Sequence, residues 1–253
     1  MENPIIDLIH QHVSIRRYTR EPVTQEMIET IVKAGQKAST SSNLQIYSVV
    51  AVMDEQKLTA LAKIADQEFI ATAPVVLVWC ADLARLDRVC QLQGLEQQVG
   101  YVDNFLLAAV DASLAAQNAA LAAESLGLGM CYLGALRKDA GGVIKLLQLP
   151  RLVFPVFGMA IGWPESKPAI KPRLPLKAVL HWETYDTHLD DQLKAYDQEM
   201  AQTGMYVGRQ SPYPGREGVM ENYGWLEHSA RKAARGARQD LRTVLEEQGF
   251  LLK

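Results

Sequence analysis

Residues 103–126 constrain the fold of this 253-residue chain more than any other segment. Alanine and large aliphatic residues follow one another through it, so apolar side chains surround almost the whole circumference of the predicted helix. At 1.5 Å per residue such a helix is about 36 Å long. A helix that is apolar on nearly all sides has to be buried. A dimer interface made of helices buries it more readily than one domain of this size does.

Shorter patterns on both sides of this helix predict further helices and strands around one sheet. Cap residues followed by helical spacing predict helices over 3–11 and 24–37. The run 75–81 is apolar in every position, as in a central strand that is buried on both faces. Further helices are expected at 55–65, 139–147, 190–202 and 225–248, and further strands at 47–53, 130–134 and 152–163. These elements predict an α+β or α/β core.

Composition limits the class of protein. Hydrophobic residues make up 48% of the chain, charged residues 22%, and the formal net charge is −3. These values are ordinary for a globular protein and give no global field that favours nucleic acid. Three cysteines without a Cys-x-x-Cys pair favour a reducing compartment. No signal peptide is apparent, and no run approaches the roughly 18 apolar residues of a membrane helix. The chain is expected to be cytoplasmic, with no nucleic-acid or membrane partner.

Two basic clusters suggest a site for an anion. Residues 12–18 combine a histidine, a hydroxyl and two arginines, and Lys171 and Arg173 flank a proline far downstream. Guanidinium groups stay charged and make strong, often bidentate, hydrogen bonds to phosphate. The hypothesis is that both clusters converge on one phosphate-bearing cofactor. Basic residues on solvated surface loops are the plainer interpretation of each cluster taken alone.

Several motifs of self-sufficient catalysis are absent from the sequence. It has no Gly-x-x-x-x-Gly-Lys-Ser/Thr loop and no Gly-x-Ser-x-Gly elbow, and its five histidines show no metal-ligand spacing. Gly127-x-Gly129 follows a helix and enters a strand, the reverse of the order in a dinucleotide fold. Hydrogen-bond donors without an evident acid, base or nucleophile are typical of enzymes whose cofactor does the chemistry. We therefore expect no catalytic side chain and no metal.

Five motifs occur in order along nearly the whole chain. They are His12-x-Ser14-Ile15-Arg16-Arg17-Tyr18, the Ser/Thr loop ending in Leu44-Gln45, Ala119-Ala120-x-x-Ala123-Glu124-Ser125-Leu126-Gly127-Leu128-Gly129, Gly158-x-x-x-Gly162-Trp163-Pro164 and Lys171-Pro172-Arg173-Leu174-Pro175. Together they resemble the oxygen-insensitive nitroreductase/flavin reductase family, above all its NADPH-preferring A-type branch.

The resemblance implies an α+β fold of the nitroreductase type and a homodimer. In that fold a central mixed antiparallel sheet is flanked by helices, and long buried helices pair the subunits. The implied division is an FMN-binding core over 1–175 and a C-terminal extension over 176–253. The extension is too polar to form a core of its own, and the resemblance implies that it is an arm over the core and the partner subunit.

The resemblance also implies the residues of the cofactor site. Contacts to FMN are implied for His12, Ser14, Arg16, Thr40, Ser41, Ser42, Leu44, Gln67, Tyr132, Leu133, Gly134, Ala135, Lys171 and Arg173. The basic residues among them would hold the phosphate or the pyrimidine edge, and residues 132–135 would run beside the ring. Arg209, assisted by Arg216, is implied to bind the 2′-phosphate of NADPH from a loop rich in glycine and proline.

The activity that the resemblance implies is two-electron reduction of nitroaromatics, quinones or flavins, with NADPH or NADH as hydride donor. Flavin N5 would take the hydride, and one site would serve both substrates in a ping-pong mechanism. Two other functions stay open. One is a reductase that supplies free reduced FMN to a partner oxygenase, and the other is a flavin-binding module without turnover. Reductive dehalogenation or flavin fragmentation would need a substrate-closing lid that the sequence does not reveal.

Overall fold

One antiparallel sheet lies at the centre of the fold. In this computed structural model, which describes residues 3–218 and 220–250, the strand order is β1-β2-β4-β3. The strands are β1 (Tyr47–Val52), β2 (Val75–Asp82), β3 (Gly129–Leu133) and β4 (Val153–Gly162). Every residue of β2 is buried, which confirms the prediction of a central strand from its continuous apolar run.

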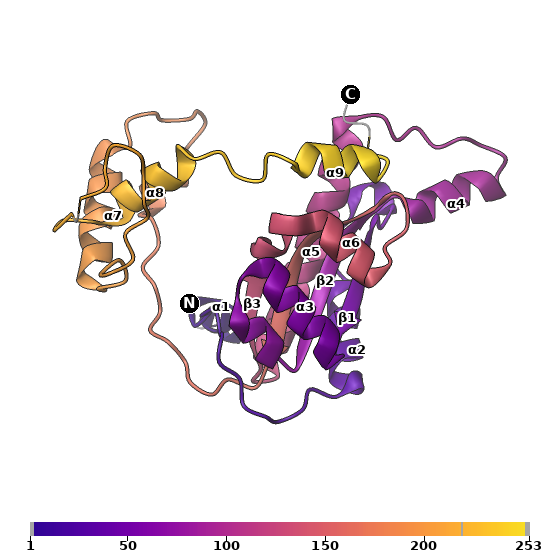
Figure 1. Cartoon of the computed structure of the whole chain (residues 1–253), viewed down its shortest axis with the longest axis horizontal. Coiled ribbons are helices and arrows are strands. Elements are labelled where there is room, and N and C mark those ends of the chain that lie inside the picture. The colour runs from indigo at the N-terminus through magenta and orange to yellow at the C-terminus, as the bar shows by residue number, and fades with distance from the viewer. Residues whose placement is uncertain (1–2, 219, 251–253) are drawn as a thin grey trace. The chain divides into compact units, whose positions relative to one another are not determined.

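Helices cover both faces of this sheet (Figure 1). The α-helices are α1 (Pro4–His10), α2 (Gln25–Gly35), α3 (Glu55–Ala65), α4 (Ala84–Leu92), α5 (Val102–Ser125), α6 (Ala140–Leu147), α7 (Asp190–Gln202), α8 (Trp225–Ala233) and α9 (Leu241–Glu247). Short 3-10 turns are η1 (Ser41–Asn43), η2 (Glu68–Thr72), η3 (Gly134–Asp139) and η4 (Leu176–Ala178). The mixture of helices with one antiparallel sheet confirms the α+β class.

Alternate side chains of β2 face two different layers of helices. Leu77 and Trp79 pack in a cluster with α2 and α5, whereas Val78 and Cys80 pack in a second cluster with α3 and α6. Successive side chains of a strand point to opposite faces, so a strand between two helical layers needs apolar residues at every position. Burial also raises the pKa of the Cys80 thiol to about 12.

The long helix α5 begins and ends within one residue of its prediction. Its alanines pack closely against α2: a Cβ added to Gly35 would lie 2.9 Å from the carbonyl oxygen of Ala115. Among the described helices, α5 is long and apolar enough to cross a membrane by length and composition. The expectation that no run approaches that length was therefore wrong. Its buried alanine face is that of a core helix.

One side of α5 is not covered within a single chain. Leu106, Val110 and Leu114 are 56%, 45% and 46% exposed, although the sequence predicted burial on nearly all sides. These residues recur four apart and form one apolar stripe along the helix, which we call the α5 stripe. The difference arises because one chain places its core against only part of the circumference.

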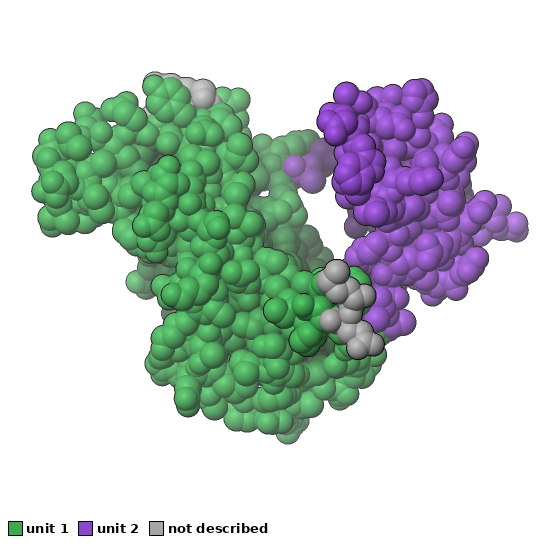
Figure 2. All heavy atoms as spheres, turned by 180° about the vertical axis from the view of Figure 1, so that it is seen from behind, with its two compact units in different colours: residues 1–168, 238–253 green, residues 169–237 purple. Residues whose placement is uncertain are grey.

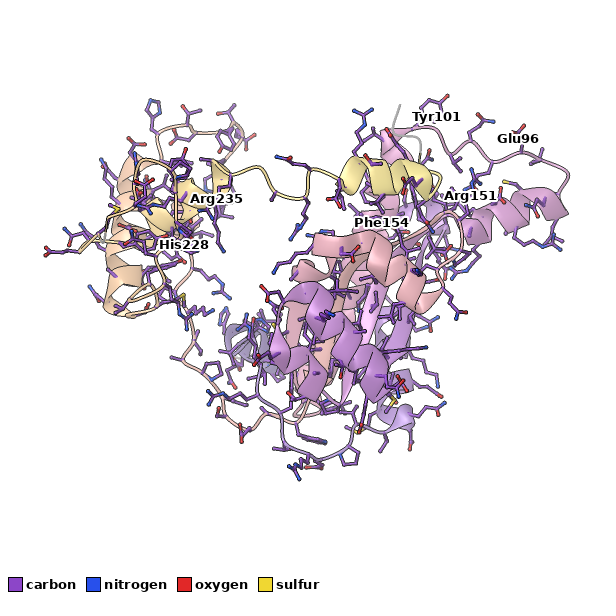
Figure 3. All side chains as sticks on the ribbon, in the orientation of Figure 1. Glu96, Tyr101, Arg151, Phe154, His228 and Arg235 are labelled. Carbon is purple, nitrogen blue, oxygen red and sulfur yellow. The ribbon has the colours of Figure 1, made fainter. Side chains whose placement is uncertain are left out.

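The prediction of one continuous C-terminal helix over 225–248 was wrong. The structure has α8 and α9 instead, and Arg238 between them takes a positive φ of 57°. A left-handed residue after Gly236 interrupts the helical hydrogen-bond ladder. Beyond α9, Phe250 packs edge-on against Phe154, which is labelled in Figure 3. This contact anchors the chain end in the core around the sheet.

The chain forms two compact units, coloured separately in Figure 2. One contains residues up to 168 together with those from 238 onward, and the other contains residues 169–237. In the second unit, Tyr196 and Met200 of α7 and Arg231 of α8 are buried. The ring of Tyr196 meets Trp225 edge-on at 5.0 Å between centroids. A segment expected to be too polar for its own core thus builds a small one around a buried guanidinium.

Candidate active site

Helix α5 contacts three of the segments that the sequence singled out. Its polar residues Asp111, Gln117 and Glu124 hold, in this order, the Ser/Thr loop, the end of β3 and the N-terminal basic cluster. From Asp111 to Glu124 the helix rises about 20 Å. Segments that are far apart in the sequence are therefore tied to one rigid element.

The N-terminal basic cluster runs beside the edge strand β3. The N–H of Ile15 donates to the carbonyl oxygen of Met130 at 2.9 Å, and Ser14 forms a β-bridge with the same residue. Gly129 permits this approach, because a Cβ there would lie 2.4 Å from Cγ1 of Ile15. Ile15 is buried and Arg16 is exposed, so the backbone is fixed while the guanidinium reaches the surface.

The side chains of this cluster meet two further elements. His12 Nδ1 lies 2.5 Å from Oε1 of Glu124, and the imidazole is 30% exposed. The guanidinium of Arg16 lies 6.0 Å from the ring centroid of Phe69, a cation–π distance. Phe69 belongs to η2, and Gln67 precedes this turn at its N-cap position without a capping hydrogen bond from its side chain. Arg16 therefore lies beside η2, the turn that begins directly after Gln67.

A groove of about 950 Å³ borders Arg16. Its lining combines three arginines with four glutamates and with apolar residues, among them Met53 directly after β1 and Phe69 of η2. The mixed charge gives it no strong preference for anions. Within residues 3–218 and 220–250, no group of three or more His, Cys, Asp or Glu side chains is arranged to hold a metal ion.

The Ser/Thr loop has an unusual backbone. Ser42, Asn43 and Gln45 have φ values of 48°, 56° and 53°, in the left-handed region that residues other than glycine rarely adopt. Such conformations cost free energy and persist where surrounding structure holds them. Thr40 precedes the η1 turn in extended backbone. Leu44, which was predicted to pack near the ring, is 39% exposed.

Two side chains hold the loop from its flanks. Asp111, which is 1% exposed, accepts from the N–H of Ser41 at 3.0 Å and from the N–H of Ile46 at 3.3 Å. Arg85, at the start of α4, donates to the carbonyl oxygen of Gln45 at 2.8 Å. The Asp111 carboxylate therefore accepts hydrogen bonds from two N–H groups of the loop. The Arg85 guanidinium donates a hydrogen bond to a carbonyl oxygen of the same loop.

The end of β3 presents an aromatic side chain. Tyr132 is 38% exposed and meets Phe157 edge-on at 5.4 Å between centroids. Its hydroxyl donates to Oε1 of Gln117 at 3.3 Å. Burial raises the pKa of Tyr132, and the nearby Glu124 raises it further, so the phenol stays neutral. Leu133 points into the core and is 1% exposed, which leaves only its backbone to face a ligand.

Two guanidinium groups lie around the turn that follows β3. Arg238 donates to the carbonyl oxygen of Gly134 at 3.0 Å, and Arg137 donates to the carbonyl oxygen of Val156. Burial lowers the pKa of Arg137, and the charge of Arg238 lowers it further. The sequence pointed to Gly134 and Ala135 but to neither arginine. Arg238 could not be predicted here, because it lies about 100 residues later in the chain.

Four of the predicted basic residues lie in the second unit, namely Lys171, Arg173, Arg209 and Arg216. Lys171, Arg173 and Arg209 are exposed there. The guanidinium of Arg173 donates to the carbonyl oxygen of Lys171 at 3.2 Å, across the intervening proline.

Arg216 is engaged by a carboxylate of the second unit. It donates to both oxygens of Glu227 at 2.9 Å, and Arg231 donates to Glu227 Oε1 at 2.7 Å. Hydrogen bonds from Arg231 and Arg216 lower the pKa of Glu227, and the bond to Glu227 raises the pKa of Arg216. Arg231 also donates to the carbonyl oxygen of Ser211 at 2.7 Å, which anchors the loop that carries Arg209 and Arg216.

Sequence reasoning missed Asp111 as a site residue and assigned Glu124 no role of its own. A signal for Asp111 was present: it is an isolated carboxylate in a helix predicted to be buried, and a buried charge requires partners. The partners themselves could not be predicted, because they lie in a loop about 70 residues earlier in the chain.

Comparison with known proteins covers both parts of the chain. The model of the nitroreductase family matches residues 9–163, and that of the nitroreductase family C-terminal domain matches residues 171–253. A Bacillus subtilis (strain 168) FMN reductase that uses NAD(P)H is 37% identical over 253 residues, with 98% of each chain covered. The oxygen-insensitive NADPH nitroreductase of Salmonella typhimurium is 36% identical over 250 residues, also with 98% of each covered.

Solved structures agree with the sequence matches. NfrA2 of B. megaterium has a TM-score of 0.91 at 35% identity, with all of both chains covered. The NADPH:FMN oxidoreductase of Vibrio harveyi, solved with NAD+, has a TM-score of 0.87 at 34% identity, with 99% of this chain and 100% of that chain covered. The family models, the relatives and the solved structures agree with the five ordered motifs, and the chain therefore belongs to the nitroreductase family.

Proposed function

We propose that this protein is an FMN-dependent NAD(P)H oxidoreductase that reduces nitroaromatics, quinones or flavins in two-electron steps. The observation that carries the proposal is the convergence on α5 of the N-terminal basic cluster, the strained Ser/Thr loop and the end of β3. Relatives that match nearly the whole chain carry the names of NADPH and NAD(P)H reductases. These names support a reduced nicotinamide as the electron donor. The relatives named FMN reductase also support FMN as the flavin.

The donors present in the first unit fit FMN. Since Glu124 faces Nδ1 of His12, the Nε2 side of the ring is left to meet a phosphate. Ser14 adds a hydroxyl, and Arg16 adds a guanidinium next to the segment of Gln67. Lys171 and Arg173 remain proposed phosphate ligands, and Arg209 and Arg216 proposed ligands of the NADPH 2′-phosphate, on the sequence resemblance.

FMN held by these residues would supply the two-electron chemistry between the nicotinamide donor and the acceptor. The chain's own residues bind and orient. Arg16 would place positive charge near the pyrimidine edge and so stabilise the negative charge that reduction of FMN brings. The backbone N–H groups of Gly134 and Ala135 would lie beside the ring, as the sequence resemblance implies. The proposed mechanism requires no nucleophilic or general-acid side chain.

We further propose a cytoplasmic homodimer paired through the α5 stripe of Leu106, Val110 and Leu114. Exposed apolar residues at four-residue spacing on a long helix suit packing against a second copy of the same helix. The C-terminal extension over 176–253 is proposed to act as an arm over the core and the partner subunit. Three cysteines without a disulfide suit a reducing compartment.

An absorbance spectrum of the purified protein, before and after NADPH under argon, tests the proposal. The two visible flavin bands should be present and should bleach on addition of NADPH. A colourless protein that also fails to take up added FMN would refute it. Persistence of the bands with no oxidation of NADPH, under argon or in air, would leave a flavin-binding module without turnover.

A dedicated flavin reductase is the second candidate, favoured by the relatives named FMN reductase. Turnover with free FMN and with nitrofurazone separates the two functions. A dedicated flavin reductase turns over free FMN much faster than the nitroaromatic, whereas a general reductase accepts both. The comparison uses the same enzyme preparation and a saturating concentration of NADPH.

A further inference from the structure

Asp111 is an isolated carboxylate in the middle of the alanine-rich helix α5. It is 1% exposed, and alanines surround it on the same helix. Removing an ionised carboxylate from water is costly unless hydrogen-bond donors replace the water. Burial of Asp111 therefore requires compensation from elsewhere in the fold.

The compensation comes from the two ends of the Ser/Thr loop. Oδ1 accepts from the N–H of Ser41 and Oδ2 from the N–H of Ile46. The residues between these two donors include Ser42, Asn43 and Gln45, all with positive φ. Each oxygen thus fixes one end of a segment whose own backbone preferences oppose its shape.

We propose that Asp111 is a positioning residue that holds the Ser/Thr loop in its FMN-binding shape. The inference rests on the proposed function, which places this loop against the flavin. Holding a strained loop before the ligand arrives removes the ordering cost from binding. Without the carboxylate the loop relaxes, and FMN has to select a minor conformation of it, which weakens its apparent affinity.

The two-donor geometry explains why a carboxylate is needed. An asparagine has nearly the same shape, but its amide presents one oxygen and one N–H₂ group. One loop amide would then face a donor instead of an acceptor. Asp111→Asn therefore removes one of the two bonds while leaving the packing of α5 almost unchanged.

The first experiment measures FMN binding by the apoprotein through quenching of flavin fluorescence. Asp111→Asn is compared with wild type and with Asp103→Asn, the same substitution at an exposed position in the first turn of α5. Loss of a charge-assisted buried bond predicts a Kd about ten- to a hundredfold higher for Asp111→Asn. Asp103→Asn should bind FMN as wild type does.

The second experiment follows hydrogen exchange of the Ser41 and Ile46 amides by NMR. In wild-type apoprotein both amides should be protected, and in Asp111→Asn at least one of them should exchange about tenfold faster. The wild-type measurement keeps the inference testable if the variant does not fold. Unprotected Ser41 and Ile46 amides in the wild type would overturn it.

The outcomes separate this inference from the proposed function. A lower melting temperature with unchanged Kd and unchanged exchange of both amides would make Asp111 a merely structural group and overturn the inference. Wild-type apoprotein that binds no FMN would refute the proposed function and, with it, the role of the loop in FMN binding. Weaker FMN binding together with faster exchange at Ser41 or Ile46 supports both.

Discussion

Glu124, in the last turn of α5, lies 2.5 Å from Nδ1 of His12 through its Oε1 atom. The contact joins residues that are 112 positions apart in the chain. It fixes the imidazole ring of a residue that the sequence assigned to a phosphate. A ring that is held through Nδ1 presents Nε2 in a defined direction, as second-sphere carboxylates do for histidines at other sites.

Glu124→Ala should therefore weaken FMN binding by about tenfold, since the ring loses a charge-assisted partner. Glu124→Gln keeps an acceptor without the charge and should fall between this variant and wild type. Ser125→Ala, at the next position, serves as control because its hydroxyl bonds only the carbonyl oxygen of Ala122 on its own helix. Fluorescence titration of the apoproteins measures each Kd. Equal affinities for all four proteins would show that the contact does not orient His12 for FMN.

Arg16→Ala should lose FMN. The exposed guanidinium of Arg16, in the N-terminal basic cluster, is proposed to pair with the flavin, and loss of such a partner costs about ten- to a hundredfold in affinity. Arg20→Ala removes an exposed guanidinium four residues later and should retain the cofactor. The ratio of flavin to protein absorbance after gel filtration measures occupancy. Full occupancy and activity in Arg16→Ala would contradict the assignment.

Gly129→Ala should destabilise the fold by about 1–3 kcal/mol, as overpacking of a tight contact does. Its new Cβ would lie 2.4 Å from Cγ1 and 2.7 Å from Cβ of Ile15, so the N-terminal segment would have to move away from β3. Gly141→Ala is the matched control in α6, where the nearest atom, Oδ1 of Asp139, would be 3.8 Å from the new Cβ. Alanine in a helix with free space is stabilising. In urea denaturation, the free energy of unfolding should therefore fall below that of wild type for Gly129→Ala and rise above it for Gly141→Ala.

Leu114→Glu should convert the proposed dimer into monomers. The substitution places a charge in the proposed interface along the α5 stripe, where desolvation of an unpaired carboxylate is costly. The dimer dissociation constant is expected to rise by about a hundredfold or more. Lys57→Glu, on the exposed side of α3, is the control for added negative charge. Sedimentation velocity measures the association state, and an unchanged dimer in Leu114→Glu would place the interface elsewhere.

Glu227 should stabilise the second unit in a pH-dependent manner. Hydrogen bonds from Arg231 and Arg216 lower its folded-state pKa. A carboxylate with a lowered folded pKa contributes stability above its unfolded pKa, about 4.3, and loses it as the pH falls through the folded value. The melting temperature of wild type should therefore be higher than that of Glu227→Gln at pH 7. This difference should disappear below about pH 4. Thermal unfolding measured across this pH range tests the prediction, with Glu199→Gln on α7 as control. A difference in melting temperature between wild type and Glu227→Gln that grows as the pH falls would contradict it.

Local patterns in the sequence predicted most of the elements. Asn3 and Thr24 cap the first two helices through their side chains, as their positions before apolar-periodic segments indicated. The apolar run in β2 predicted a strand buried on both faces. These predictions succeeded because capping, helical spacing and strand alternation depend on residues only a few positions apart.

The sequence by itself determined most of the helices, the central strand and, through five ordered motifs, the family, but it gave no sign of α4 and did not separate α8 from α9. Only the tertiary structure decided that Asp111 reaches the Ser/Thr loop, that Glu124 reaches His12, and that Arg238 lies between α8 and α9 and contacts the turn after β3. Each of these depends on which distant segments pack together. Long-range packing is a sum of many weak contacts, and no short stretch of the sequence carries that information.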